Sequence, residues 1–98
     1  MNQYMVVIKL PSELTDEFIA LIPGHRAQVN ALMGRGIITS YALALDRSMI
    51  WTTIVAETAA SVDEILETLP LREFIEPTVV PLAFSQNVGR LSQHVSLN

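Results

Sequence analysis

The sequence predicts a small α+β domain in which two helices cover one face of a four-stranded antiparallel sheet. Segments with strand and helix patterns follow one another in the order strand, helix, strand, strand, helix, strand. Two helices cover only one face of such a sheet. The chain of 98 residues is long enough for one hydrophobic core, and 50% of its residues are apolar while 16% are charged. This apolar fraction is high for so small a domain, so we expect part of the surface to be an interface.

The first strand and the first helix have clear signals. The run Tyr4–Leu10 reads YMVVIKL and is typical of a central strand. Thr15 precedes two acidic residues and predicts a helix start, because a hydroxyl caps backbone N–H groups and carboxylates favour the positive end of the helix dipole. Apolar side chains then recur at helical spacing, with one histidine among them. The stripe consists of Leu14, Phe18, Leu21, Ile22, His25, Val29, Leu32 and Met33.

Pro23 lies inside this helix, and Gly34 and Gly36 follow its last apolar residues. An interior proline costs about 3 kcal/mol, so we expect a kink or a short break there. The stripe keeps its phase on both sides of Pro23, which indicates that both segments lie on one surface. The glycines predict the end of the helix.

Residues 37–45 and 49–57 are expected to form a hairpin, with Asp46-Arg47-Ser48 as the connection. Neither strand has a clean polar side, although a half-exposed antiparallel sheet normally shows one. Tyr41 and Trp51 are candidates to line the face that the helices leave uncovered. Burial of about 800 Å² per partner is ordinary for an interface. We therefore expect a homodimer or a higher homo-oligomer that covers this face.

A second helix and a last strand complete the domain. Ser61-Val62-Asp63-Glu64 matches a capping box, Pro70 ends the helix, and Leu71–Ile75 is expected to add one turn. The last strand, Thr78–Phe84, is expected at an edge of the sheet. Pro77 and Pro81 lie an even number of residues apart, so the N–H groups that both prolines lack can face away from a partner strand. Residues 1–84 thus form the predicted domain. Residues 85–98 form a tail that we expect to pack on a neighbouring subunit through apolar side chains, namely Val88, Leu91, Val95 and Leu97.

Composition excludes several classes of function. The net charge is -4, and the single lysine and scattered arginines lack the clustered positive charge that nucleic-acid binding needs. No apolar run approaches the roughly 20 residues that span a membrane, and the start lacks the basic region of a signal peptide. The absence of cysteine excludes disulfides and thiol nucleophiles and suits a cytoplasmic location. His25 and His94 have no metal-ligand spacing, so no metal site is expected.

His25 is the first candidate for acid–base chemistry. It lies on the apolar stripe in helical phase with Ile22 and Val29, which predicts a position in the cleft between the first helix and the sheet. An imidazole titrates near neutral pH and both accepts and returns a proton. The alternative is a partly buried histidine that is hydrogen-bonded to a backbone carbonyl.

Carboxylates, aromatic residues and arginines supply the other candidates. Asp46 either partners His25 or is an ordinary turn residue. Glu57 either acts as a general base in the cleft or marks the point where a strand meets water. Tyr41 and Trp51 line a pocket for a flat apolar ring or belong to the sheet or dimer core. The remaining candidates either anchor a substrate carboxylate or are surface and interface residues: Arg26, Arg47, Arg72 and Glu76.

Four segments together resemble the muconolactone Δ-isomerase-like group of the dimeric α+β barrel superfamily. They are YMVVIKLP, ALMGRGII, LALDRSMIW and ETLPLREFIEPTVVPLAF, so the resemblance covers roughly residues 3–85. It implies a ferredoxin-like βαββαβ protomer, two sheets packed face to face as a barrel, and larger rings built from dimers through C-terminal segments. It also implies a reaction without a metal or organic cofactor, in which proton abstraction and return move a double bond in an unsaturated lactone.

A second resemblance is to the YciI-like proteins of the same superfamily, whose His…Asp pair is similar to His25 and Asp46. Three hypotheses stay open. The first is a cofactor-free isomerase or lyase acting on a small unsaturated lactone or related acid, with His25 as acid and base, Asp46 or Glu57 assisting, and an arginine on the carboxylate. The second is a non-catalytic barrel that binds a small apolar ligand. The third is a purely structural oligomer.

Overall fold

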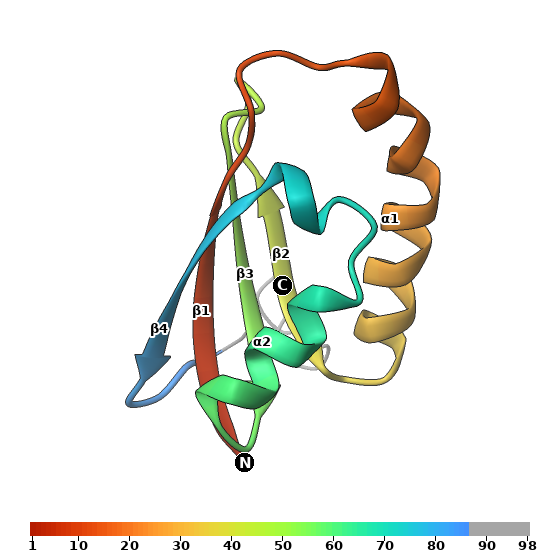
Figure 1. The fold of residues 1–98 in the computed structure, drawn as a ribbon. Coiled ribbons are helices and arrows are strands. Elements are labelled where there is room, and N and C mark those ends of the chain that lie inside the picture. The colour runs from red at the N-terminus through yellow and green to blue at the C-terminus, as the bar shows by residue number, and fades with distance from the viewer. Residues whose placement is uncertain (87–98) are drawn as a thin grey trace, which may run out of the picture.

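The computed structural model describes residues 1–86, and these form one four-stranded antiparallel sheet with its helices on one face. In chain order the elements are β1 (Asn2–Lys9), α1 (Asp16–Gly34), β2 (Ile38–Leu43), β3 (Met49–Ala56), α2 (Ala59–Glu67), the 3-10 helix η1 (Arg72–Phe74) and β4 (Glu76–Leu82) (Figure 1). The predicted ferredoxin-like α+β arrangement is confirmed. Most of the predicted tail, residues 87–98, lies outside the described residues.

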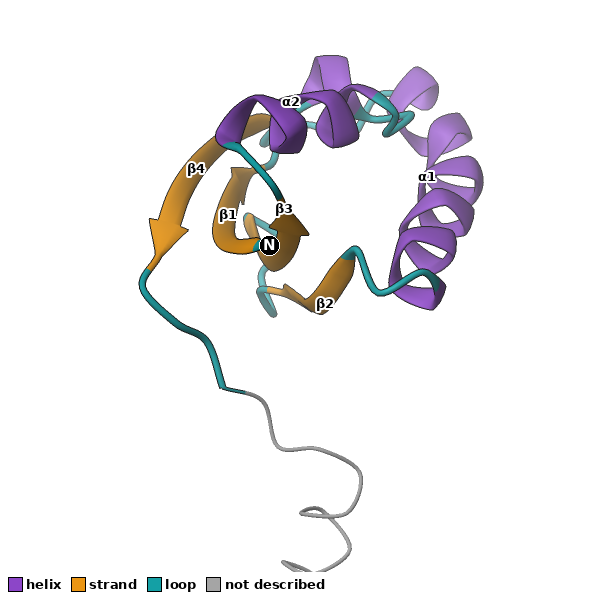
Figure 2. Ribbon diagram, turned by 90° about the horizontal axis from the view of Figure 1, so that it is seen from below, coloured by secondary structure: helices purple, strands orange, loops and turns teal. Residues whose placement is uncertain are grey.

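The sheet has the strand order β2-β3-β1-β4, so β2 and β4 form its edges. Helix α1 packs against β2, whereas α2 packs against β3 and β4. Figure 2 shows both helices on the same side of the curved sheet. The opposite side is called the outer face here. It consists of Gln3, Met5, Val7 and Lys9 of β1, Ser40 and Ala42 of β2, Met49, Trp51, Thr53 and Val55 of β3, and Glu76, Thr78, Val80 and Leu82 of β4.

The hydrophobic core fills the space between the sheet and the helices. Alternate residues of the central strands point into it, including Val6 of β1 and Ile54 of β3. The rings of Phe18 and Phe74 meet edge to face, with centroids 5.7 Å apart, and thereby join α1 to η1. No helix within residues 1–86 combines the length and the apolar character needed to cross a bilayer.

Helix α1 begins as predicted and continues through its proline. The Thr15 hydroxyl oxygen accepts a hydrogen bond of 3.1 Å from the backbone N–H of Phe18. The helix is unbroken from Asp16 to Gly34, so the break considered at Pro23 does not occur. The residue four positions before the proline, Ile19, is 48% exposed. Water therefore reaches the side of the helix where the carbonyl of Ile19 lacks its usual N–H partner.

Helix α2 begins earlier than the capping-box pattern indicates. Thr58, and not Ser61, is the N-cap, and its hydroxyl oxygen accepts a hydrogen bond of 3.1 Å from the backbone N–H of Ser61. Two hydroxyl residues three positions apart both suit a cap. Thr58 takes the role because it is still extended, with φ of -140°, directly after β3. Ser61 therefore lies inside the first turn of α2.

The hairpin between β2 and β3 contains one strained residue. The backbone N–H of Arg47 donates to the carbonyl of Ala44 at 2.9 Å, and the N–H of Ala44 donates to the carbonyl of Met49 at 2.9 Å. This turn places Arg47 at φ of 63°, in the left-handed region that favours glycine. The Arg47 side chain is exposed. The contribution of Arg47 to the free energy of folding therefore comes from its backbone conformation and not from its guanidinium.

Replacing Arg47 with glycine is expected to stabilise the fold by about 0.5 to 1 kcal/mol, because relief of the left-handed strain exceeds the entropy that glycine adds to the unfolded chain. Arg47→Ala is the matched control, since it removes the same side chain and keeps the strain. Urea unfolding of both variants measures the difference. Equal stabilities for the two variants would contradict a backbone origin.

Candidate functional site

A pocket of about 230 Å³ opens between α1 and β2 and contains the candidate histidine. Five of its residues come from α1 and one from β2. Its lining consists of His25, Arg26, Val29, Asn30, Met33 and Tyr41. The pocket combines an imidazole, a phenol, a guanidinium and an amide with two apolar side chains. These are groups that bind and polarise a small organic acid.

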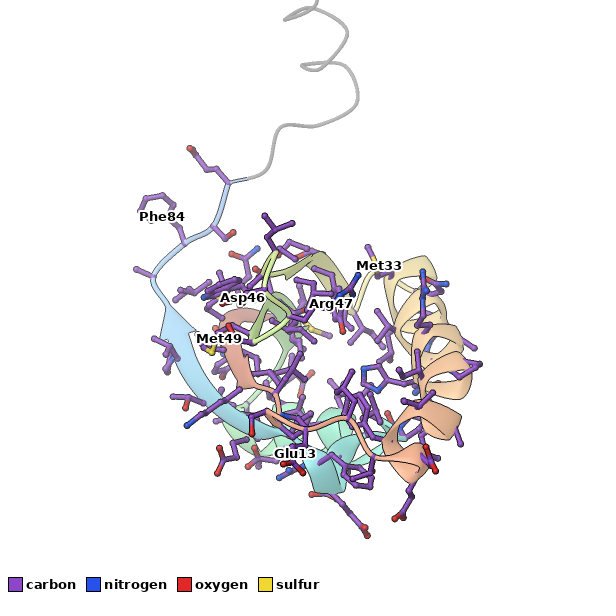
Figure 3. The ribbon with its side chains drawn as sticks, turned by 90° about the horizontal axis from the view of Figure 1, so that it is seen from above. Glu13, Met33, Asp46, Arg47, Met49 and Phe84 are labelled. Carbon is purple, nitrogen blue, oxygen red and sulfur yellow. The ribbon has the colours of Figure 1, made fainter. Side chains whose placement is uncertain are left out.

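Helical spacing explains the part of the lining that α1 provides. His25 and Val29 are four positions apart, as are Arg26 and Asn30, so each pair lies on one side of the helix. Met33 extends the same side by one more turn, and Figure 3 labels it at the C-terminal end of α1. Asn30 and Met33 line the pocket but are not among the predicted site residues. Continuing the spacing from His25 and Arg26 along the helix would have found both.

A bulge in β2 explains why Tyr41 faces the helices. Ile38 pairs with Ile54, but Ser40 pairs with Thr53, so Thr39 is an extra residue in β2. Downstream of it Tyr41 pairs with Thr52, which is buried on the helix side. The expectation that Tyr41 and Trp51 share the uncovered face is wrong, because it assumes an unbroken alternation along β2.

His25 is buried and lacks a partner for one ring nitrogen. Its side chain is 6% exposed, and Nδ1 has no hydrogen-bond partner among residues 1–86. Burial lowers the pKa of the imidazole, because removal from water disfavours the charged form. His25 is therefore neutral near pH 7, and its buried Nδ1 is left without a hydrogen bond among the described residues.

Tyr41 and Arg26 act on each other electrostatically across the pocket. Burial raises the pKa of the Tyr41 phenol, and the nearby positive charge of Arg26 opposes this shift. Tyr41 is therefore protonated near neutral pH and available as a hydrogen-bond donor. A guanidinium and a phenol in one pocket favour a ligand that carries negative charge.

The two candidate carboxylates lie elsewhere. Asp46 is exposed in the hairpin turn, where Oδ1 accepts hydrogen bonds from Ser48 N at 3.0 Å and Ser48 Oγ at 2.6 Å. These bonds, the side-chain one first, lower the pKa of Asp46. Glu57 is exposed just beyond β3, where its backbone carbonyl accepts a 2.8 Å bond from Asn2 Nδ2. Neither residue lines the His25 pocket.

The remaining candidates are also separate from this pocket. Figure 3 shows Arg47 on the hairpin beside Asp46. Trp51 lies on the outer face and is 40% exposed. The Nε atom of Arg72 lies 3.3 Å from Oε1 of Glu67, which forms an ion pair on the surface. Glu76 is the exposed first residue of β4. The structure thus brings together only three of the predicted site residues, namely His25, Arg26 and Tyr41.

Within the described part of the chain, no three His, Asp or Glu side chains are grouped closely enough to hold a metal ion. Neither the protein-family models nor the curated proteins with which the sequence was compared match it.

Acidification should destabilise the protein through His25. Its folded-state pKa is lowered, so below about pH 6.5, the usual histidine value, the unfolded chain binds more protons than the folded one. The free energy of unfolding is therefore highest above that pH, where His25 is neutral in both states, and it decreases as the pH falls below that value. Urea unfolding at pH 5 and pH 7.5 should show a smaller loss for His25→Leu than for the wild type. An equal loss in both would contradict this prediction.

Proposed function

We propose that the His25 pocket binds a small unsaturated lactone or carboxylic acid and that His25 moves a proton on it. The observation that supports this most is the buried, unpartnered Nδ1 of a neutral imidazole beside Arg26 and Tyr41. The muconolactone isomerase resemblance of the sequence points to the same chemistry. Such a reaction needs a base, a donor for developing negative charge and an anchor for a carboxylate.

The proposed reaction is an isomerisation. Neutral His25 accepts a proton from the γ carbon of the lactone ring, which follows the conjugated double bond, and the electron pair of the broken C–H bond moves through that double bond onto the carbonyl oxygen. The Tyr41 hydroxyl donates a hydrogen bond to that oxygen. His25 then returns the proton to the carbon next to the carbonyl, so the double bond moves out of conjugation and no atom is gained or lost. Arg26 binds the carboxylate at the pocket.

Turnover of muconolactone, followed by the loss of the ultraviolet absorbance of its conjugated double bond, tests this proposal. His25→Ala should lower kcat/KM by about 100-fold or more, which is the usual contribution of a positioned acid or base. Arg26→Gln should mainly raise KM, and Arg35→Gln is its matched control because Arg35 does not line the pocket. Unchanged turnover in folded His25→Ala would refute the role of His25.

A second candidate function is ligand binding without turnover. It is favoured by the position of Asp46, which is engaged with Ser48 and does not orient the imidazole. A histidine base usually gains from a carboxylate partner that fixes its tautomer. Thermal shifts with muconolactone and benzoate distinguish the two functions. Stabilisation that requires His25 and Arg26, without any turnover, would support the binding module over the enzyme.

We also propose that two copies pair through their outer faces. Val7, Trp51 and Val80 leave apolar surface on this side, and Trp51 and Val80 are 40% and 44% exposed. The charged residues of this face, Lys9 and Glu76, lie opposite each other at one end of it. An apolar surface with polar residues at its rim is typical of a homodimer interface. Light scattering at micromolar concentration should give the mass of two protomers.

A further inference from the structure

The bulge in β2 is held by a buried group of hydroxyls. Ser40 Oγ and Thr53 Oγ1 are 2.7 Å apart, with Ser40 donating. The backbone N–H of Thr53 donates to Ser40 Oγ at 3.2 Å, and Thr52 Oγ1 donates to the carbonyl of Ser40 at 2.8 Å. Thr52 and Thr53 are each only 2% exposed. Buried hydroxyls of this kind need their partners, since an unpaired one costs about 1 to 3 kcal/mol.

The hairpin needs a bulge because its two ends differ in register by one residue. At the open end Ile38 pairs with Ile54, whereas near the turn Leu43 pairs with Ile50. One extra residue must therefore lie in β2 between these points. The place of that residue determines which face each intervening side chain occupies, because a shift of one residue moves a side chain to the other face.

Tyr41 lies within the affected stretch. With the extra residue at Thr39, Tyr41 pairs with Thr52 and lines the pocket. With the extra residue beyond Tyr41, the register of Ile38 and Ile54 would continue, and Tyr41 would pair with Trp51 on the outer face. The apolar pattern does not decide between these arrangements, because both sides of residues 37–45 are rich in apolar and small side chains.

We propose that Ser40 and Thr53 are positioning residues for the ligand site, because their hydroxyl pair fixes the bulge at Thr39 and so holds Tyr41 on the side of His25. Neither residue lines the pocket. Both lie on the outer face, and they act on the site only through the register of β2. This inference rests on the proposed function for its role in ligand binding, whereas the placement of Tyr41 is testable without a ligand.

The direct test compares Ser40→Ala and Thr53→Val with the conservative Thr53→Ser. Valine has nearly the volume of threonine but lacks its hydroxyl, whereas serine keeps the hydroxyl. In the wild type and in Thr53→Ser, NOE spectra should show contacts of the Tyr41 ring with Val29 or Met33. In the other two variants, contacts with the Trp51 indole should appear, and the titration midpoint of His25 should rise toward that of an exposed histidine.

Amide spectra establish that each variant is folded, and Ser40→Ala carries the test if Thr53→Val does not fold. Pocket contacts and a His25 titration that stay unchanged in folded Ser40→Ala would overturn the inference. Muconolactone affinity should weaken about tenfold in Ser40→Ala, as expected for one lost hydrogen bond. If neither the wild type nor any variant binds muconolactone, the proposed function fails. The NOE contacts then still decide whether the hydroxyl pair positions Tyr41.

Discussion

Replacing Ile54 with alanine is expected to lower the free energy of unfolding by about 3 to 4 kcal/mol. Ile54 is 1% exposed and lies between Tyr4 and Ile38 in the sheet, both of which are also buried. The substitution removes three carbon atoms from a site with little freedom to collapse, so it loses both hydrophobic transfer energy and packing contacts. For a domain of this size the melting temperature should fall by roughly 15 to 20 °C.

Ile19→Ala is the matched control, because it makes the same chemical change at a side chain that is 48% exposed on α1. Its effect should stay within about 0.5 kcal/mol. Both variants are measured by thermal and urea unfolding at one protomer concentration, since an oligomer makes stability concentration-dependent. Similar losses for the two variants would mean that the core does not centre on β3.

Replacing Trp51 with glutamate is expected to weaken the proposed dimer by about 1000-fold. Trp51 is the largest side chain of the outer face, and it lies opposite Ala42 and Val7 in the middle of it. Loss of a central interface tryptophan typically costs about 2 kcal/mol or more. A two-fold interface contains each substitution twice, which doubles the loss to about 4 kcal/mol, or three factors of ten in Kd.

Sedimentation velocity over a range of concentrations measures this change. Ile19→Glu is the control, because it introduces the same charge at a comparably exposed apolar residue of α1, on the helix side of the sheet. It should leave the mass unchanged. A wild-type chain that sediments as one protomer at micromolar concentration, or Trp51→Glu that sediments as the wild type does, would refute pairing through the outer face.

Local chemistry in the sequence is sufficient to predict most of the fold. The apolar spacing of α1 gives its buried side, where Phe18, Val29 and Leu32 enter the core. Thr15 is a correct cap because Asp16 and Glu17 follow it directly and mark the first turn of α1, whereas Thr58 and Ser61 compete for the start of α2. The parity of Pro77 and Pro81 correctly predicts an edge position for β4.

The site is less predictable because it depends on register and on distance across the fold. The helical stripe places His25 beside the sheet, but nothing in the pattern of residues 37–45 marks Thr39 as an extra residue. An unbroken alternation consequently predicts Tyr41 on the wrong face. The resemblance to the YciI-like proteins predicts a pairing of Asp46 with His25, whereas the Asp46 carboxylate accepts hydrogen bonds within its own turn.

The two prolines of β4 also limit how these molecules aggregate. A strand from another chain can extend a sheet only where edge N–H groups are free to donate, and Pro77 and Pro81 offer none. The other edge, β2, has no proline. Edge-to-edge addition is thus disfavoured at β4, and two molecules joined through β2 would present β4 edges outward. Growth of the kind that leads to fibrils is therefore disfavoured beyond that pair, because each free end lacks two of its outward N–H donors.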